Sequence, residues 1–415
     1  MPFDFATYRH LAQKFGDAFF LLDERAFETN LNEFLAHFQA TYPRTSLGYS
    51  YKTNYLPRLG QIVQRVGQYA EVVSAMEFEL ARLLGVPGER IIFNGPLKQE
   101  PELARAMLQG AMINLDGLEE LELAARIASL YPQRHFALGL RCNLDLGEKR
   151  ISRFGFDADS PDLDAAVKRL RSLPNVELAG LHCHLSTPGR TVESYRLRTE
   201  QLLNLADRYF PEAPPRYLDI GGGFYGKVPS GLRAQFSHEL PDYGQYAGVI
   251  APLLKKRYGV QGPELILEPG VAVVSDVLRF VTSVVGLKTI HGRQLALVIG
   301  SIHNVKPTGT EIKLALELFA NPEANRQIGG PVDLVGYTCM EHDCLYPEYP
   351  GKVGLGDIAV FHNMGAYTIV FKPPFIRPNP PIVGYDSQTE QFTLLRREET
   401  TADVFATFVG VGAER

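Results

Sequence analysis

The residue types that could do chemistry gather at the ends of short apolar segments. Lys52 follows the segment 46–51 and lies within the aromatic stretch Tyr49–Tyr55. A lysine that is partly desolvated among aromatic rings favours the neutral amine that a Schiff base requires. From this residue alone, a surface lysine whose stem lies along apolar neighbours is the simpler interpretation.

Two histidines, His182 and His184, end another apolar segment. Side chains alternate along a strand, so both histidines are expected on one face. Such a pair could bind zinc. It could equally place an imidazole against a flat cofactor, or consist of hydrogen-bonded core histidines, and the motif alone does not decide.

A glycine run and a glutamate end two further segments. In Asp219-Ile-Gly-Gly-Gly223 the backbone N–H groups can approach and hold an anion, although a glycine run is often only a turn. Glu268, in Glu268-Pro-Gly270, follows an apolar segment, so we expect a buried carboxylate with a cationic partner. A protonated ring nitrogen or a structural salt bridge would supply that partner.

Two motifs in the last third of the chain carry reactive side chains. The stretch Cys339–Cys344 contains two cysteines, Glu341, a histidine and Asp343, but their spacing does not match a usual zinc site. The phenol of Tyr367, in Gly365-Ala-Tyr367, could reach a phosphate, and in isolation this residue is typical of a protein core.

Eight candidate strands alternate with amphipathic helical segments between about residues 21 and 270, which predicts a TIM-type (β/α)8 barrel over residues 20–274. In this fold the active site lies at the C-terminal ends of the strands, where the motifs above are found. A helix is expected after Asp23, and Ser74 and Glu77 form a capping box that opens another. The candidate strands are Ser46–Tyr51, Ala70–Val73, Ile91–Phe93, Met112–Leu115, Phe136–Arg141, Leu178–Cys183, Tyr217–Ile220 and Leu265–Leu267.

The rest of the chain, residues 1–19 and 275–415, is expected to form a mostly antiparallel β-domain. Helical signal is weak there except over Glu311–Phe319, and the proline-rich stretch Lys372–Pro381 cannot be a central strand. The expected strands are Leu278–Val285, Leu295–Ile299, Val332–Tyr337, Ile358–Phe361 and Phe392–Leu395.

Composition excludes several classes of protein. The chain has 415 residues and a formal net charge of −5, so it has no basic field with which to bind nucleic acid. We expect neither a membrane span nor a secretory signal, because no long uncharged apolar run occurs. Four cysteines favour a reducing compartment, which predicts a cytoplasmic protein.

Together the motifs resemble the fold-type III decarboxylases that use pyridoxal phosphate (PLP), such as the diaminopimelate and ornithine decarboxylases. The resemblance implies a PLP-binding barrel with an alanine racemase-like β-domain, an amino-acid substrate, and a homodimer with shared active sites. The motifs that carry it are Tyr51-Lys52-Thr-Asn54, Glu71-Val-Val-Ser74-Ala-Met-Glu77, Ser152-Arg-Phe-Gly155, His182-Cys-His184, Asp219-Ile-Gly-Gly-Gly223, Glu268-Pro-Gly270, Cys339-x-x-x-Asp343 and Gly365-Ala-Tyr367.

The resemblance also implies a role for each site residue. Lys52 forms the Schiff base with PLP, and Glu268 pairs with the pyridine nitrogen and keeps it protonated, which makes the ring a strong electron sink. Cys339 enters the partner's site and protonates or shields the reacting carbon, with Glu341 and Asp343 near the substrate. The remaining cofactor-binding residues are His184, which stacks on the ring, Gly222, Gly223, Thr187 and Tyr367 at the phosphate, and Arg141 and Gly270.

A glutamate opposite the ring nitrogen favours decarboxylation over racemisation, since alanine racemases of this fold have an arginine there. The family's usual Glu-Pro-Gly-Arg is here Glu-Pro-Gly-Val271, which disfavours diaminopimelate itself. This departure is similar to the carboxynorspermidine and siderophore-pathway branches, which act on larger conjugated amino acids. We therefore expect a decarboxylase of diamino or conjugated amino acids. The alternatives are a PLP-dependent racemase or epimerase, a metal-dependent barrel hydrolase, and a non-catalytic homologue.

Overall fold

The structure is a computed structural model that describes residues 3–147, 151–185, 189–309, 312–371 and 373–410. The chain divides into two compact units. Residues 28–226 and 238–273 form the first, which we call the barrel unit, and residues 1–27, 227–237 and 274–415 form the second, the β-sheet unit.

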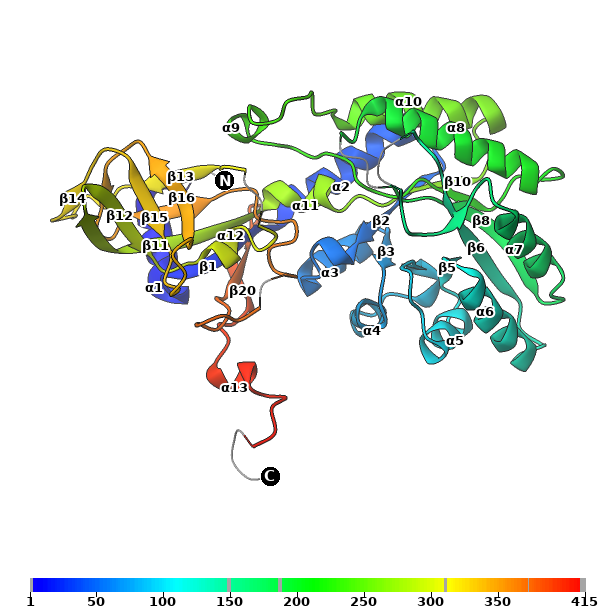
Figure 1. Ribbon diagram of the computed structural model, residues 1–415, viewed down its shortest axis with the longest axis horizontal. Coiled ribbons are helices and arrows are strands. Elements are labelled where there is room, and N and C mark those ends of the chain that lie inside the picture. The colour runs from blue at the N-terminus through cyan, green and yellow to red at the C-terminus, as the bar shows by residue number, and fades with distance from the viewer. Residues whose placement is uncertain (1–2, 148–150, 186–188, 310–311, 372, 411–415) are drawn as a thin grey trace. The chain divides into compact units, whose positions relative to one another are not determined.

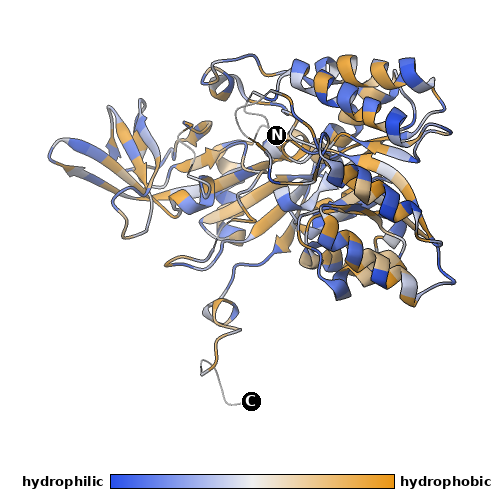
Figure 2. Ribbon diagram, turned by 45° about the vertical axis from the view of Figure 1, so that its right-hand side comes forward, coloured by the Kyte–Doolittle hydropathy of each residue, from blue (hydrophilic) through white to orange (hydrophobic). Residues whose placement is uncertain are grey.

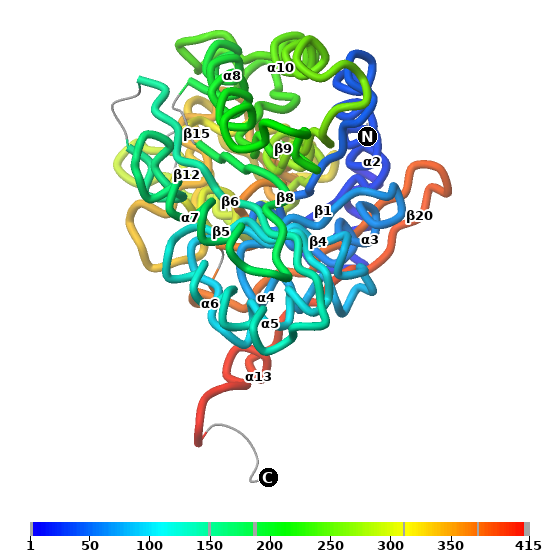
Figure 3. The backbone as a smooth tube through the Cα atoms, turned by 90° about the vertical axis from the view of Figure 1, so that its right-hand side faces the viewer, coloured from blue at the N-terminus to red at the C-terminus, as the bar shows by residue number. Residues whose placement is uncertain are grey.

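The barrel unit is a closed ring of eight parallel strands (Figures 1 and 3). The expected TIM-type barrel is therefore confirmed, and each expected strand agrees with an observed one to within two residues at either end. Pairing of β5 with β6 closes the ring, and the two-residue β7 (Phe156–Asp157) adds to the edge of β6. The barrel strands are β2 (Thr45–Ser50), β3 (Tyr69–Val72), β4 (Ile91–Phe93), β5 (Met112–Leu115), β6 (Phe136–Asn143), β8 (Val176–His182), β9 (Tyr217–Asp219) and β10 (Glu264–Leu267).

The barrel strands are short apolar runs because both of their faces are covered. Every residue of β3, β4 and β9 is buried, which is typical of parallel strands between a filled barrel interior and an outer layer of helices. In Figure 2 the helices around the barrel carry both hydrophilic and hydrophobic residues along their length. Because the eight strands are parallel, the last residue of each strand and the loop after it lie at one common rim.

Helices cover the outside of the barrel. Helix α4 begins after Ser74, whose hydroxyl accepts the backbone N–H of Glu77, as the sequence predicts. Helix α2 begins after Asp23, which accepts the N–H of Ala26, and it runs from the β-sheet unit into the barrel unit. The helices are α2 (Glu24–Gln39), α3 (Pro57–Arg65), α4 (Ala75–Leu83), α5 (Glu100–Leu108), α6 (Leu118–Leu130), α7 (Pro161–Arg171), α8 (Val192–Tyr209), α10 (Tyr243–Tyr258) and α11 (Val271–Val274).

The β-sheet unit is mostly antiparallel, as expected, with parallel pairings between β1 and β19 and between β12 and β15. Helix α1 packs through Tyr8 and Leu11 on this sheet. The elements of the unit are α1 (Phe5–Phe15), β1 (Ala18–Asp23), α9 (Ser230–Arg233), β11 (Leu278–Ile290), β12 (Arg293–Val298), α12 (Ile302–Val305), β13 (Leu316–Phe319), β14 (Gln327–Ile328), β15 (Val332–Val335), β16 (Cys344–Tyr349), β17 (Val353–Gly354), β18 (Ile358–Phe361), β19 (Ile382–Asp386), β20 (Gln391–Arg396) and α13 (Thr401–Val404).

One expectation for this unit needs correction. The helix expected over Glu311–Phe319 is wrong throughout its described part, because residues 312–315 form no helix and Leu316–Phe319 is strand β13, paired antiparallel with β18. The strand partner overrides the local helical pattern. The division into compact units also differs from the expected boundary at residue 20, because β1 pairs with β11 and β19 of the β-sheet unit, and residues 227–237 belong to that unit as well.

Within the described part of the chain, no helix combines the length and the hydrophobicity needed to cross a lipid bilayer.

Candidate active site

Every strand of the barrel contributes a polar residue at its C-terminal end or directly after it. All of these side chains are buried except that of Lys52, which is partly exposed. So many polar groups in an otherwise apolar interior require partners, and the barrel supplies them from one strand to the next. The residues are Lys52 after β2, Glu71 in β3, Asn94 after β4, Asn114 in β5, Arg141 in β6, His182 in β8, Asp219 in β9 and Glu268 after β10.

Lys52 lies in a short 3₁₀ helix, Tyr51–Thr53, directly after β2. Its ammonium group forms an ion pair with Glu71 and lies 3.3 Å from the Ser50 hydroxyl, which itself donates to Glu71 at 2.6 Å. The lysine is therefore held at the rim by a buried carboxylate. The sequence motifs contained Glu71 but gave it no role.

Glu268 is 1% exposed and lies between the two histidines expected at the site. Its carboxylate oxygens are each 3.4 Å from a histidine nitrogen, Nε2 of His182 and Nδ1 of His184. Burial alone would raise the pKa of Glu268, but its interactions with His182 and Lys52 hold that pKa well below the ordinary value. The site thus keeps a negative charge at its centre.

The ring of His184 is neutral at physiological pH. Burial, together with the charges of Lys52 and Arg141, lowers its pKa to about 4 even though Glu268 lies nearby. The backbone N–H of Gly222 donates to Nδ1 at 3.0 Å, so the proton of the neutral ring is on Nε2. Burial also lowers the pKa of His182.

Asp219 lies close to Glu268 at the centre of the barrel, but its pKa shifts in the opposite direction. Burial and the charge of Glu268 raise the pKa of Asp219 well above the ordinary value, because two close carboxyls do not both ionise. Among the described residues, Asp219 Oδ2 has no hydrogen-bond partner, while Oδ1 accepts the N–H of Gly221 at 2.8 Å. Ligand atoms of His182, Asp219 and Glu268 lie within 4.8 Å of one another, a group that does not include His184.

A directed chain of hydrogen bonds crosses the barrel interior to reach Glu268. The hydroxyl of Tyr217 donates to Asn114 Oδ1 at 2.7 Å, and Asn114 Nδ2 donates to Asn94 Oδ1 at 2.8 Å. The amide nitrogen of Asn94 then donates to both Glu71 and Glu268. This one amide therefore joins the carboxylate beside Lys52 to the carboxylate between the histidines. Asn94 had no signal in the sequence beyond its place after a strand.

The glycine run after β9 can hold an anion. Glycine is required at position 222, where a Cβ atom would lie 2.2 Å from the carbonyl oxygen of Glu268. The N–H groups of Gly221 and Gly222 donate to Asp219 and His184, whereas those of Gly223 and Phe224 have no acceptor among the described residues. Of the two glycines expected at a phosphate, Gly223 therefore offers the free donor.

Two further expected residues lie at the same rim. Arg141 is buried; its guanidinium lies 4.6 Å from the centre of the Phe154 ring, donates to the carbonyl of His184 at 3.2 Å and pairs with Asp116 at 3.3 Å. Gly270 has no room for a side chain, since a Cβ atom would lie 2.1 Å from the Thr53 hydroxyl. Thr187 lies outside the described residues.

The remaining expected residues belong to the β-sheet unit. Cys339 and Glu341 are exposed on the loop between β15 and β16. Asp343 is buried, and its carboxylate accepts hydrogen bonds from the N–H of Ile302 at 2.6 Å and from the hydroxyl of Thr338 at 2.6 Å. In this structure Asp343 therefore shapes the loop that presents Cys339.

Tyr367 follows strand β18 and Gly365, which has no space for a side chain because a Cβ atom would lie 1.6 Å from the carbonyl of Val274. Tyr367 itself has φ = +62°, a left-handed conformation that is costly for a bulky residue and is often found at functional sites.

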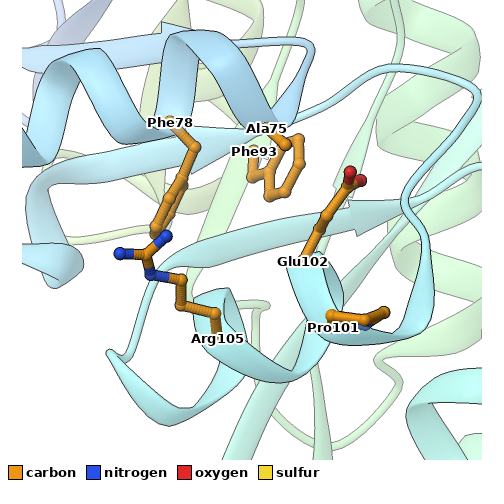
Figure 4. Close-up of a pocket in the computed structure, with 6 residues that line it drawn as sticks. All are labelled: Ala75, Phe78, Phe93, Pro101, Glu102 and Arg105. Atoms are coloured by element: carbon orange, nitrogen blue, oxygen red, sulfur yellow. The ribbon is translucent and has the colours of Figure 1, made fainter. Parts of the chain in front are cut away.

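A pocket on the barrel unit lies apart from these groups (Figure 4). It has a volume of about 220 Å³ and lies where α4 and α5 begin. Phe78 and Phe93 stack along its wall with ring centres 5.6 Å apart, and the half-buried Glu102 and the exposed Arg105 also line it. No buried ionisable side chain lines it, so it is not the candidate active site.

Comparison with known proteins identifies the family. The model described as "Pyridoxal-dependent decarboxylase, pyridoxal binding domain" matches residues 28–275, more than half of the chain. The L-glutamyl-[BtrI acyl-carrier protein] decarboxylase of Niallia circulans is 26% identical over 98% of this chain and 97% of its own length. The diaminopimelate decarboxylase of Methanocaldococcus jannaschii is 24% identical over 95% of this chain and 92% of its own.

Solved structures agree on the fold. The M. jannaschii diaminopimelate decarboxylase in complex with L-lysine superposes with a TM-score of 0.84 at 23% identity, over 96% of this chain and 94% of that chain. The lysine/ornithine decarboxylase of Vibrio vulnificus gives a TM-score of 0.72 at 19% identity, over 88% and 93%. The expectations of the family and of an amino-acid decarboxylase are thereby confirmed: the chain belongs to the pyridoxal-dependent decarboxylase family.

Proposed function

We propose that the rim of the barrel binds PLP and that this enzyme removes the α-carboxylate of a diamino acid or a conjugated amino acid. The observation that carries the proposal is the buried Glu268, which keeps its negative charge. When bound, PLP supplies an electron sink, and a carboxylate that holds the ring nitrogen protonated strengthens it for loss of CO₂.

The residues at the rim fit this cofactor. The free N–H groups of Gly223 and Phe224 suit a phosphate. The neutral His184 ring can lie against a flat aromatic ring without adding a charge. We assign the remaining phosphate contacts to Thr187 and Tyr367, and we place Arg141 and Gly270 in the cofactor-binding set.

Lys52 would hold the cofactor covalently. Its amine must lose a proton before it can attack a carbonyl, and Glu71 is the carboxylate placed to accept or share that proton. His182 and Asp219 would then act on Glu268 and not on the substrate, because both are buried beneath the rim.

We infer that the enzyme is a homodimer in which Cys339 protonates or shields the reacting carbon in the partner's site. The exposure of Cys339 supports this role, since a buried thiol could not enter another subunit's site. We place Glu341 near the substrate as well. Asp343 would act through the shape of its loop, because its carboxylate is buried and already hydrogen-bonded.

For the substrate we favour a conjugated amino acid. Val271 brings no positive charge to the end of β10, so nothing at that position would bind a second carboxylate. The N. circulans relative is named for a glutamyl group attached to an acyl-carrier protein, which is a conjugated amino acid.

The test is CO₂ release from PLP-loaded protein. The panel comprises ornithine, lysine, arginine, diaminopimelate, carboxynorspermidine, carboxylated siderophore intermediates and a glutamyl group on an acyl-carrier protein, with Lys52→Ala as the inactive control. We expect release from a conjugated substrate and little from diaminopimelate. Exchange of the α-proton in deuterium oxide without release of CO₂ would overturn the proposal in favour of a racemase or epimerase.

A further inference from the structure

Arg198 is a buried cation without a charged partner among the described residues. It lies on α8 and is 0% exposed, and no carboxylate of the described residues forms an ion pair with it. Within the described part of the chain, its guanidinium donates to three backbone carbonyls, at 3.2 Å to Ile220, 3.3 Å to Gly222 and 2.6 Å to Leu185. Its Nε is buried without an acceptor.

Such a charge is costly unless an anion comes near it. Carbonyl dipoles and the ring of Tyr195, 4.4 Å from the guanidinium carbon, offset part of the desolvation cost. Among the described residues of the barrel unit, the other buried cations are paired with acids, Lys98 with Glu120 and Arg141 with Asp116. Arg198 is thus the one buried cation of this set for which the described residues provide no negatively charged partner.

The contacts of Arg198 determine which way the glycine run points. The carbonyl of Gly222 accepts hydrogen bonds from both Arg198 and the Tyr195 hydroxyl, the latter at 2.8 Å. A trans peptide holds its C=O and N–H on opposite sides. Fixing the Gly222 carbonyl on Arg198 therefore directs the N–H of Gly223 away from α8, and this N–H is the free donor described above.

We propose that Arg198 is a positioning residue for the phosphate of the cofactor. It aims the Gly223 N–H at the phosphate and supplies, from behind the glycine run, the positive charge that balances the phosphate. It acts through one peptide group and does not touch the phosphate. The inference rests on the proposed function, since it requires that PLP bind at this rim.

The test compares PLP with pyridoxal, which lacks the phosphate. Dissociation constants of both are measured on wild-type protein, Arg198→Gln, Arg198→Lys and the control Arg196→Gln. Glutamine still donates to a carbonyl but has no charge, whereas lysine keeps the charge. Arg196 is on the same helix, where it pairs with Glu193 and Glu200 on its outer side.

We expect Arg198→Gln to lose about ten- to hundredfold in affinity for PLP with little change for pyridoxal, as for a screened charge several ångströms away. Arg198→Lys should keep most of the preference for PLP, and Arg196→Gln all of it. If Arg198→Gln lost affinity for PLP and for pyridoxal equally, or kept the wild-type preference for PLP over pyridoxal, the inference about Arg198 would be overturned. The proposed function would not be affected by either result. Wild-type protein that does not bind PLP would overturn the proposed function.

A second measurement covers the case in which Arg198→Gln does not fold. The ³¹P resonance of PLP bound to wild-type protein is titrated, and the charge of Arg198 should hold the second phosphate pKa below its ordinary value of about 6. A pKa at or above that value would overturn the inference.

Discussion

The substitution Asn94→Asp tests the hydrogen-bonded chain that joins the two carboxylates of the site. The change keeps the shape of the side chain but replaces its amide NH₂ group, which carries two donor hydrogens, with an oxygen. In the wild-type protein those hydrogens go to Glu71 and Glu268, and the amide oxygen accepts from Asn114. The variant therefore sets a third carboxyl group directly against two others.

The size of the effect follows from electrostatics. An ionised carboxylate at position 94 would be repelled by each neighbour by about 4 kcal/mol, at a separation of about 4 Å and an effective dielectric constant of about 20. Holding the introduced group protonated at pH 7 costs about 4 kcal/mol, which is less than the two repulsions together. The introduced group should thus stay protonated, and the variant should lose about 4 kcal/mol at pH 7, plus about 1 kcal/mol for the missing second donor.

The pH dependence has a definite sign. The pKa of the introduced group is raised in the folded state, so the folded variant retains a proton that the unfolded chain releases above about pH 4. The destabilisation should be small near pH 4 and grow by about 1.4 kcal/mol for each pH unit above it, until the folded pKa is reached. The variant therefore loses stability relative to wild type as pH rises.

The assay is urea unfolding of the apo protein, followed by far-UV circular dichroism, at pH 5, 6, 7 and 8. Asn204→Asp is the matched control, because Asn204 is exposed on α8 in the same unit. The control should unfold like wild type at every pH. An Asn94→Asp variant as stable as wild type at pH 7, or a loss that does not change between pH 5 and pH 8, would refute the reasoning.

Three further predictions concern Lys52, Cys339 and Glu77. After borohydride reduction of PLP-loaded protein, mass spectrometry should find the cofactor on Lys52 and none bound covalently to Lys52→Ala; a label elsewhere contradicts the assignment. When Lys52→Ala and Cys339→Ala proteins are mixed in equal amounts and exchange subunits, about a quarter of all sites should have both wild-type residues if each site uses both subunits. If each site lies within one subunit, no site should have both. Burial raises the pKa of Glu77 to about 7, so wild type should lose stability relative to Glu77→Gln as pH rises from about 4.5 to 7; parallel pH profiles in urea would contradict this.

The sequence by itself was sufficient for the barrel. Strands such as Ile91–Phe93 and Met112–Leu115 were predicted at their observed bounds because a parallel strand buried on both faces reads as a short, mostly apolar run. Lys52 and Glu268 could be placed at the rim because they directly follow such runs. These features depend on residues that are neighbours in the sequence, so the sequence contains the information needed to predict them.

The sequence was insufficient where a partner from elsewhere decides the structure. Leu316–Phe319 has a helical pattern but is a strand because β18 pairs with it. Likewise β1 belongs to the β-sheet unit because it pairs with β11 and β19, which lie more than 200 residues further along the chain.

The roles of Asn94 and Arg198 were decided only by tertiary structure. Asn94 meets Glu268 because closure of the barrel brings β4 and β10 to one rim, although 174 residues separate them. Arg198 meets the carbonyl of Gly222 because α8 packs behind the loop after β9. A residue's type and its place after a strand are properties of the sequence, whereas the atom to which it donates depends on the neighbours that folding brings to it.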